Sequence, residues 1–149
     1  MSSPSREQLL ETAKLFIEAF NEFTPESVVR YRSPTCKHRL LPASLNSPPQ
    51  SNAEFAGFIA ALNAIMPTFH LRIVDGGEPV VDEVTRKVVL HLKSRSETAI
   101  GPYENEYVWI LTLSKDGKLV DDILEFADSL YTSDQIPKLK KAAEDAAKK

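Results

Sequence analysis

The spacing of apolar residues changes from helical to alternating at Pro67, and this change constrains the fold more than any other feature. Before Pro67, apolar residues recur every three or four positions, which is the period of an amphipathic helix. After it they alternate with polar residues, as in strands whose two faces differ. Helices that precede the strands, instead of alternating with them, predict an α+β fold.

Capping signals place the helices in the first half of the chain. Ser5 and Gln8, and later Ser51 and Glu54, have the spacing of a capping box, in which side chains satisfy the free backbone groups of a helix start. The segments expected before Pro67 are a helix over 5–23, a short helix from Thr24, an extended segment over 35–45, a loop over 46–50 and a helix over 51–66.

Alternating segments place the strands in the second half. The expected strands cover residues 68–74, 78–82, 86–98, 102–114 and 118–131. Turn residues at 84–86 and 115–118 indicate hairpins, so the last three strands should be antiparallel neighbours. We expect one domain over residues 1–137, followed by a tail over 138–149.

The expected tail differs in charge from the rest of the chain. The net charge of −3 divides into +3 on residues 138–149, which hold five lysines, one Glu and one Asp, and −6 on the remainder. The tail contains good helix formers but no apolar stripe, which predicts a helix exposed to solvent. The acidic remainder does not favour binding to nucleic acid.

Several classes of protein are disfavoured by the residues present. No apolar run approaches the roughly 18 residues that a membrane span needs, and the first residues lack the pattern of a signal peptide, so a cytoplasmic location is expected. Cys36 is the only cysteine, and the histidines at 38, 70 and 91 lack metal-binding spacing. We therefore expect neither metal nor cofactor, with Cys36 buried and His70 and His91 near the surface.

The stretch GPYENEYVWIL, residues 101–111, has one face that is polar at one end and apolar at the other. Tyr103, Asn105, Tyr107 and Trp109 share this face of the expected strand. Convergent polar groups on a mostly apolar surface suit the wall of a pocket for a small molecule.

Glu125 lies in the middle of the last expected strand, where a carboxylate is costly unless a polar group or water faces it. If its face and that of Tyr103 and Tyr107 point the same way, a carboxylate and two phenols meet in one cavity. Such a carboxyl group suits general acid or base catalysis, because a low dielectric disfavours its charged form. The phenols could stabilise a developing negative charge, and Arg32 and His38 could add a fixed positive charge and an imidazole.

Each of these residues also has a purely structural interpretation. Glu125 could form an ion pair with Arg32 or Arg39, and Arg32 could instead cap a helix carbonyl. The two tyrosines could be packing residues with satisfied hydroxyls. Whether His38 or its neighbour Arg39 points inward is open. The residues expected in the core or as the apolar lining of a binding site are Phe55, Phe58, Leu62, Met66 and Trp109.

The opposite face of the last two strands is also apolar, which is unusual for an antiparallel sheet with one solvated side. It carries Val108, Ile110, Leu124, Phe126 and Leu130. One face of the sheet can pack on the helices, and the other needs a partner, most simply a second copy of the chain. We therefore expect a homodimer formed through the outer face of the sheet.

Four stretches of the sequence, in order, are SPTCKHRLLPAS, SNAEFAGFIAAL, GPYENEYVWIL and ILEFADSLY. Together they resemble the fungal branch of the SnoaL-like proteins, which are related to polyketide cyclases and have a nuclear transport factor 2-like fold. The resemblance covers roughly residues 5–135. It implies a cone-shaped α+β domain, with helices packed on a strongly curved, mostly antiparallel sheet, and a cofactor-free dimer with a pocket in each cone.

The resemblance also implies a role in fungal secondary metabolism. It favours an isomerase or cyclase that rearranges a hydrophobic, polycyclic, oxygenated metabolite of meroterpenoid type, with catalytic groups at Tyr103, Tyr107, Glu125, Arg32 and His38. The expected substrate-binding residues are Phe55, Phe58, Leu62, Met66, Asn105 and Trp109. A semipinacol-type rearrangement of a prenylated indole alkaloid is one alternative, and a non-catalytic binding or dimerisation module is another.

Overall fold

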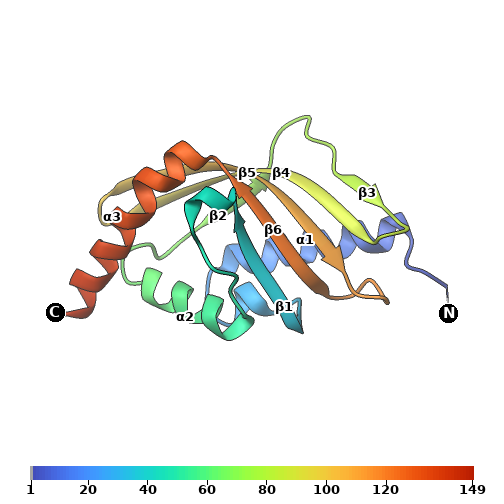
Figure 1. The fold of residues 1–149 in the computed structure, drawn as a ribbon, viewed down its shortest axis with the longest axis horizontal. Helices are drawn as coiled ribbons and strands as arrows, with labels where there is room; N and C mark the ends of the chain where they lie inside the picture. Colours follow the sequence, from blue (N-terminus) through green and yellow to red (C-terminus); the bar gives the residue numbers. More distant parts are fainter. Residues whose placement is uncertain (1) are drawn as a thin grey trace.

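The computed structural model describes residues 2–149, which form three α-helices and a six-stranded sheet (Figure 1). In chain order the elements are α1 (Arg6–Glu22), the 3-10 helix η1 (Ser27–Val29), β1 (Arg32–Leu41), the 3-10 helix η2 (Ala43–Leu45), α2 (Asn52–Leu62), β2 (His70–Ile73), β3 (Val80–Asp82), β4 (Lys87–Thr98), β5 (Gly101–Leu113), β6 (Val120–Ala127) and α3 (Ser129–Ala147). The expected α+β class is confirmed.

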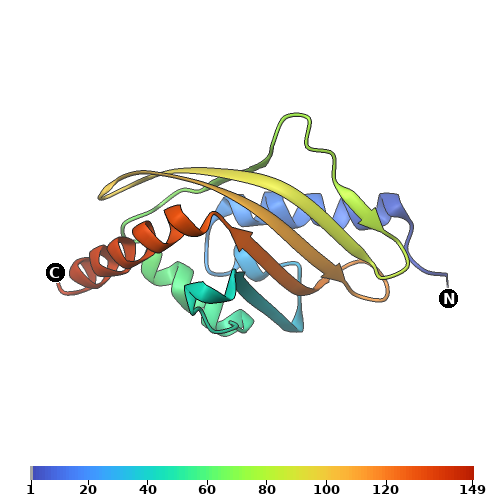
Figure 2. The ribbon, with the colours of Figure 1, turned by 45° about the horizontal axis from the view of Figure 1, so that its top comes forward.

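The sheet has the strand order β1-β6-β5-β4-β2, and β3 pairs with another part of β4. β4, β5 and β6 are antiparallel neighbours, as the turn signals predict. β1 instead lies parallel to β6, with His38 opposite Ile123 and Leu40 opposite Glu125. Figure 2 shows the long β4–β5 hairpin curving over α1. The parallel pair places an early segment of the chain beside the last strand.

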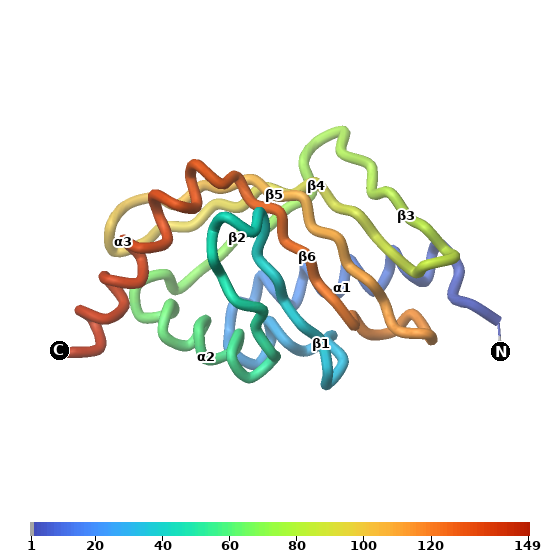
Figure 3. Tube along the Cα trace, in the orientation of Figure 1, coloured from blue at the N-terminus to red at the C-terminus, as the bar shows by residue number. Residues whose placement is uncertain are grey.

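The helices enclose the core against the sheet. α1 contacts β2, β3 and β4, α2 contacts β1, and α3 contacts both β5 and α2. In the chain trace of Figure 3, α2 and α3 lie at the end of the molecule away from the N-terminus. Aromatic side chains fill the centre, where the ring of Phe20 contacts those of Phe55, Phe69 and Trp109.

Helix caps occur where the sequence indicates them. Oγ of Ser5 accepts a hydrogen bond from the backbone N–H of Gln8 at the start of α1. Ser51 and Glu54 form a reciprocal capping box at the start of α2. The short helix expected from Thr24 is the 3-10 helix η1. These caps satisfy backbone groups that a helix end leaves free, and so fix where α1 and α2 begin.

The last expected strand, over residues 118–131, is too long. β6 ends at Ala127, and α3 begins directly afterwards because Asp128 caps it, accepting a hydrogen bond from the backbone N–H of Tyr131. α3 then continues through the expected boundary between residues 137 and 138. The tail is helical and mostly exposed, as expected, but Leu139 is an exception, because it is only 2% exposed and packs into the core.

The outer face of the sheet carries four of the five apolar residues expected there. Val108 and Phe126 are exposed, the latter by 51%, while Ile110 and Leu124 are half-buried. Leu130 was wrongly placed on this face: it lies on α3 and is 83% exposed, because the strand ends before it. An apolar strip of Val108, Ile110, Leu124 and Phe126 therefore crosses β5 and β6.

Membrane-spanning helices and metal clusters are both missing from the part of the chain that the structure describes. No helix within residues 2–149 combines the length and the apolar character needed to cross a membrane. The same residues contain no group of three or more His, Cys, Asp or Glu side chains placed to hold a metal ion.

Candidate active site

A cavity lies between the curved sheet and the three helices. It is a partly enclosed space that opens to solvent at its mouth. The residues expected to bind substrate all line it, namely Phe55, Phe58, Leu62, Met66, Asn105 and Trp109. Most of the wall is apolar, and its polar groups come mainly from β1, β5, β6 and α3.

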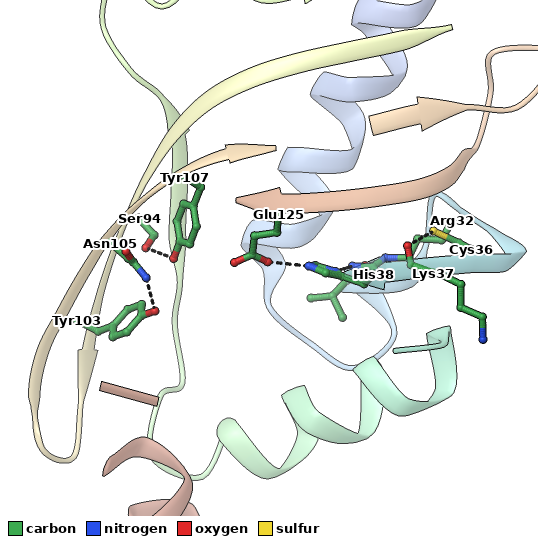
Figure 4. Close-up of polar contacts among 10 residues, drawn as sticks. Arg32, Cys36, Lys37, His38, Ser94, Tyr103, Asn105, Tyr107 and Glu125 are labelled. Carbon is green, nitrogen blue, oxygen red and sulfur yellow. Dashed lines mark hydrogen bonds and ion pairs between the residues drawn. The ribbon is translucent and has the colours of Figure 1, made fainter. Parts of the chain in front are cut away.

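Glu125 and His38 form the central polar contact of the cavity. Glu125 on β6 pairs with Trp109 on β5, and its Oε1 lies 2.6 Å from Nε2 of His38 on β1. Nδ1 of His38 lies 3.2 Å from Nη2 of Arg32, whose Nε donates to the Val28 carbonyl at 3.0 Å. Figure 4 shows Glu125 between this chain of contacts and the tyrosines of β5. Arg32, His38 and Glu125 thus form a chain of contacts from the protein interior to the cavity.

The protonation of these groups follows from their donors and acceptors. Arginine has N–H donors and no acceptor, so Nδ1 of His38 accepts a hydrogen bond from Arg32. Nε2 of His38 therefore carries the ring hydrogen and donates it to Oε1 of Glu125. Oε1 of Glu125 accepts this hydrogen bond, and no hydrogen bond within residues 2–149 occupies the second carboxyl oxygen.

Burial controls the charge of His38 and Arg32. Burial lowers the pKa of His38; the contact with Glu125 opposes this change, and the charge of Arg32 adds to it. Burial also lowers the pKa of Arg32, to about 10, so its guanidinium stays charged at neutral pH. Phe55 contacts both groups: its ring stacks on His38 with 4.6 Å between centroids, and Cζ of Arg32 lies 4.4 Å from its centroid.

A second polar cluster lies on β4, β5 and α3, and Figure 4 shows its members on β4 and β5. The Tyr107 hydroxyl lies 2.8 Å from Oγ of Ser94, and the Tyr103 hydroxyl accepts a hydrogen bond of 2.8 Å from Nδ2 of Asn105. Nδ2 of Asn105 also donates to Oγ1 of Thr132 on α3, at 3.0 Å. All five side chains are buried, so their hydrogen bonds are shielded from water.

Both phenols are neutral near pH 7. Burial raises the pKa of Tyr103 to about 12, and it raises the pKa of Tyr107 well above its ordinary value. A neutral phenol keeps its O–H donor. The cavity thus holds a carboxyl group on one wall and two phenols on another, a combination suited to proton abstraction and to stabilisation of the charge that follows.

The structure brings four of the five expected catalytic residues to the cavity, namely Glu125, Tyr103, Tyr107 and His38. Arg32 does not line it, because its side chain is buried behind His38. The suggested ion pairs of Glu125 with an arginine are wrong. His38 separates Glu125 from Arg32, and Arg39 points away from the cavity to pair with Asp122 at 2.8 Å.

Sequence reasoning missed the side of the cavity that α3 supplies. Thr132, Ile136, Leu139 and Lys140 all line it. The signal that could have found them is Asp128, because aspartate is among the favoured residues at a helix N-cap.

No protein-family model matches the chain. The austinoid biosynthesis clusters protein H of Penicillium brasilianum is 43% identical over 132 residues, which covers 85% of this chain and 87% of that relative. The crystal structure of BvnE pinacolase from Penicillium brevicompactum has 41% identity and a TM-score of 0.87, covering 93% of this chain and 98% of BvnE. The structure of AusH from Aspergillus nidulans has 41% identity and a TM-score of 0.80, covering 85% of this chain and 87% of AusH.

More distant structures share the fold alone. A protein from Shewanella denitrificans assigned to the SnoaL-like polyketide cyclases has a TM-score of 0.70 at 12% identity, over 89% of this chain and 99% of that one. The expected SnoaL-like, nuclear transport factor 2-like cone is therefore confirmed. Given this fold and the identity to protein H over most of both chains, the chain belongs to the fungal SnoaL-like family that includes the austinoid biosynthesis cluster proteins.

Proposed function

We propose that the protein is a cofactor-independent isomerase or cyclase, which rearranges a polycyclic, oxygenated fungal metabolite of meroterpenoid type by acid/base catalysis. The observation that carries the proposal is a carboxylate, Glu125, with one oxygen held by His38 and the other free in an apolar cavity beside two neutral phenols. The 43% identity to a protein of austinoid biosynthesis supports a substrate of this kind.

The reaction begins with removal of a proton by the free oxygen of Glu125, either from a carbon beside a carbonyl or from a hydroxyl. Negative charge develops on the substrate oxygen, and Tyr103 and Tyr107 stabilise it by hydrogen bonds. Return of the proton from Glu125 to another atom completes an isomerisation without change in mass. His38 donates to Glu125 throughout, and Arg32 keeps Nδ1 of His38 an acceptor.

The apolar wall of the cavity restrains the substrate and limits water. Phe55, Phe58, Met66 and Trp109 come from α2, its following loop and β5, and they surround the polar groups. A fitted cavity holds a rigid polycyclic substrate in a single orientation, which selects one rearrangement among several. Exclusion of water protects a reactive intermediate from hydrolysis.

A semipinacol-type rearrangement is the second candidate, because BvnE pinacolase is 41% identical and has a TM-score of 0.87. In this reaction Glu125 removes the proton of a hydroxyl that becomes a carbonyl, and a carbon substituent migrates to the adjacent carbon. The C–O bond on that carbon breaks, and the departing oxygen takes up the proton. A prenylated indole alkaloid is the expected substrate. A neighbouring gene for a terpene cyclase favours the first candidate, and one for an indole prenyltransferase the second.

Glu125→Gln separates a catalyst from a non-catalytic binding module. The amide oxygen still accepts a hydrogen bond from His38, so the fold and the cavity are retained, but the amide cannot take up a proton. Turnover should fall by about 10²- to 10⁴-fold, while ligand affinity changes little. A variant altered in affinity alone would identify a binding module.

The substrate can be found by incubating the purified protein with extracts of a producing strain that lacks the gene. Mass spectrometry should show an accumulated compound converted to a product of equal mass, and the Glu125→Gln protein in the same extract is the matched control. Conversion at equal rates by both proteins would contradict the proposed role of Glu125.

The apolar strip on the outer face supports a homodimer, which we propose forms through β5 and β6. Exposed apolar surface that crosses two adjacent strands is uncommon on a monomer. A two-fold axis through this face would bring the strip of one copy against the same strip of the other.

A further inference from the structure

All hydrogen-bonding groups of the Asn105 side chain are occupied by the protein itself. Its Oδ1 accepts a hydrogen bond from the backbone N–H of Glu106 at 2.8 Å. One hydrogen on Nδ2 is donated to the Tyr103 hydroxyl at 2.8 Å and the other to Oγ1 of Thr132 at 3.0 Å. Asn105 lines the cavity, yet it has no N–H left for a substrate. Its N–H groups therefore act on Tyr103 and Thr132 and not on a substrate.

The contact with Glu106 fixes which way the Asn105 amide points. A backbone N–H only donates, so the amide atom that faces it is the oxygen, and the atom that faces Tyr103 is the nitrogen. An amide nitrogen only donates, so the Tyr103 oxygen accepts. The hydroxyl hydrogen of Tyr103 therefore points away from Asn105. The Tyr107 hydroxyl is its hydrogen-bonding neighbour within the cavity.

Thr132 connects this amide to the first turn of α3. Its Oγ1 accepts the second Nδ2 hydrogen, which prevents Asn105 from rotating without loss of a buried hydrogen bond. The Tyr131 hydroxyl fixes the same turn by accepting a hydrogen bond from the backbone N–H of Glu104 at 2.9 Å. α3 is thus attached to β5 at two adjacent points, one of which leads directly to Tyr103.

We propose that Asn105 and Thr132 are positioning residues, which orient the Tyr103 hydroxyl as a hydrogen-bond donor to the substrate oxygen. The inference rests on the proposed acid/base function and assigns α3 a part in it. A hydroxyl that is free to rotate must lose that freedom when charge develops on the substrate. A hydroxyl already directed at the cavity stabilises the charge without reorganisation, which is the basis of preorganised electrostatic catalysis.

Asn105→Asp tests the proposal because it reverses the hydrogen bond with almost no change in shape. A carboxylate only accepts, so the Tyr103 hydroxyl would donate to it and not to the substrate. The turnover number kcat should fall by about 10- to 100-fold, with a smaller change in KM. An unchanged kcat would overturn the proposal.

Thr132 offers a second, independent series on α3. Thr132→Val keeps the shape of the side chain but removes the oxygen that accepts from the Asn105 amide, so kcat should fall. Thr132→Ser keeps the hydroxyl, so its kcat should equal that of the wild type. Ser133→Ala is the matched control, because Oγ of Ser133 donates only to the Leu130 carbonyl of the same helix. Failure of the serine variant to restore kcat would overturn the role of Thr132.

A measurement without substrate separates this proposal from the proposed function. The ¹³C chemical shift of the Tyr103 ring carbon that bears the hydroxyl should change in Asn105→Asp and stay constant in Ser133→Ala. Wild-type turnover with no change of shift in Asn105→Asp would overturn the positioning role and leave the proposed function intact. A changed shift in a protein that turns over no candidate substrate would overturn the proposed function, and with it the catalytic purpose of the orientation.

Discussion

His38 contacts a guanidinium at Nδ1 and a carboxylate at Nε2, and its ring is stacked on Phe55. The side chain is 4% exposed, so water cannot solvate a second ring proton. Burial is therefore the largest influence on this group, and it lowers the pKa of His38. The folded protein binds that proton less readily than the unfolded chain does.

The free energy of unfolding should consequently fall as the pH drops below about 6.5, the ordinary pKa of histidine. Above this pH the His38 ring is neutral in both the folded and the unfolded state, and its contribution to the free energy of unfolding is fully present. Below it the unfolded chain takes up a proton that the folded protein resists, until the lowered pKa is reached. The slope due to His38 is at most about 1.4 kcal/mol per pH unit. Urea denaturation at several pH values measures it.

His38→Gln should remove this part of the slope, because glutamine does not titrate. His70→Gln is the matched control, since His70 is exposed at the start of β2. Equal slopes for the wild type and His38→Gln would show that burial of this ring does not contribute to the pH dependence of the free energy of unfolding.

One wall of the site can be predicted from the sequence better than the other. Alternation along β5 places Tyr103 and Tyr107 on one face, because successive side chains of a strand point to opposite sides. The choice between His38 and Arg39 depends on the parallel pairing of β1 with β6, which no local signal encodes. Thr132, the partner of Asn105 on α3, was missed because the last strand was expected to continue to residue 131.

α3 shows how a continuing pattern can mislead at the level of an element. Apolar residues keep alternating to residue 131, so the pattern predicts a strand that extends beyond Asp128, although Asp128 caps the helix. Pro137 reinforces the error, because proline within a helix removes a backbone hydrogen bond and usually marks a start or a break. Here Ile136 and Leu139 pack against the core on both sides of the proline.

Leu139→Ala should therefore lower the free energy of unfolding by about 2–4 kcal/mol, through the cavity that it leaves in the core. Leu130→Ala is the same change on the same helix at a position that is 83% exposed, and it should cost less than about 0.5 kcal/mol. Urea denaturation of both variants measures the difference. Equal losses would show that α3 is not packed through Leu139.

At the scale of the whole molecule, the apolar strip on β5 and β6 predicts the assembly. Phe126→Glu should convert a dimer into a monomer, because burying an unpaired charge in an interface is costly. Val84→Glu is the matched control, since Val84 is 87% exposed in the turn between β3 and β4. Sedimentation velocity should find the wild type and Val84→Glu dimeric. A monomeric wild type would contradict the proposed assembly.

The parallel pairing of β1 with β6 also has a consequence for biosynthesis. His38 and Glu125 are 87 positions apart, and among the strands of residues 2–149 β1 pairs with β6 alone, while His38 also forms a bridge with Gln50. A ribosome finishes β1 long before β6 exists, so the nascent chain carries an unpaired strand edge through most of translation. We therefore expect β1 to join the sheet late in folding, because contacts so distant in sequence close slowly.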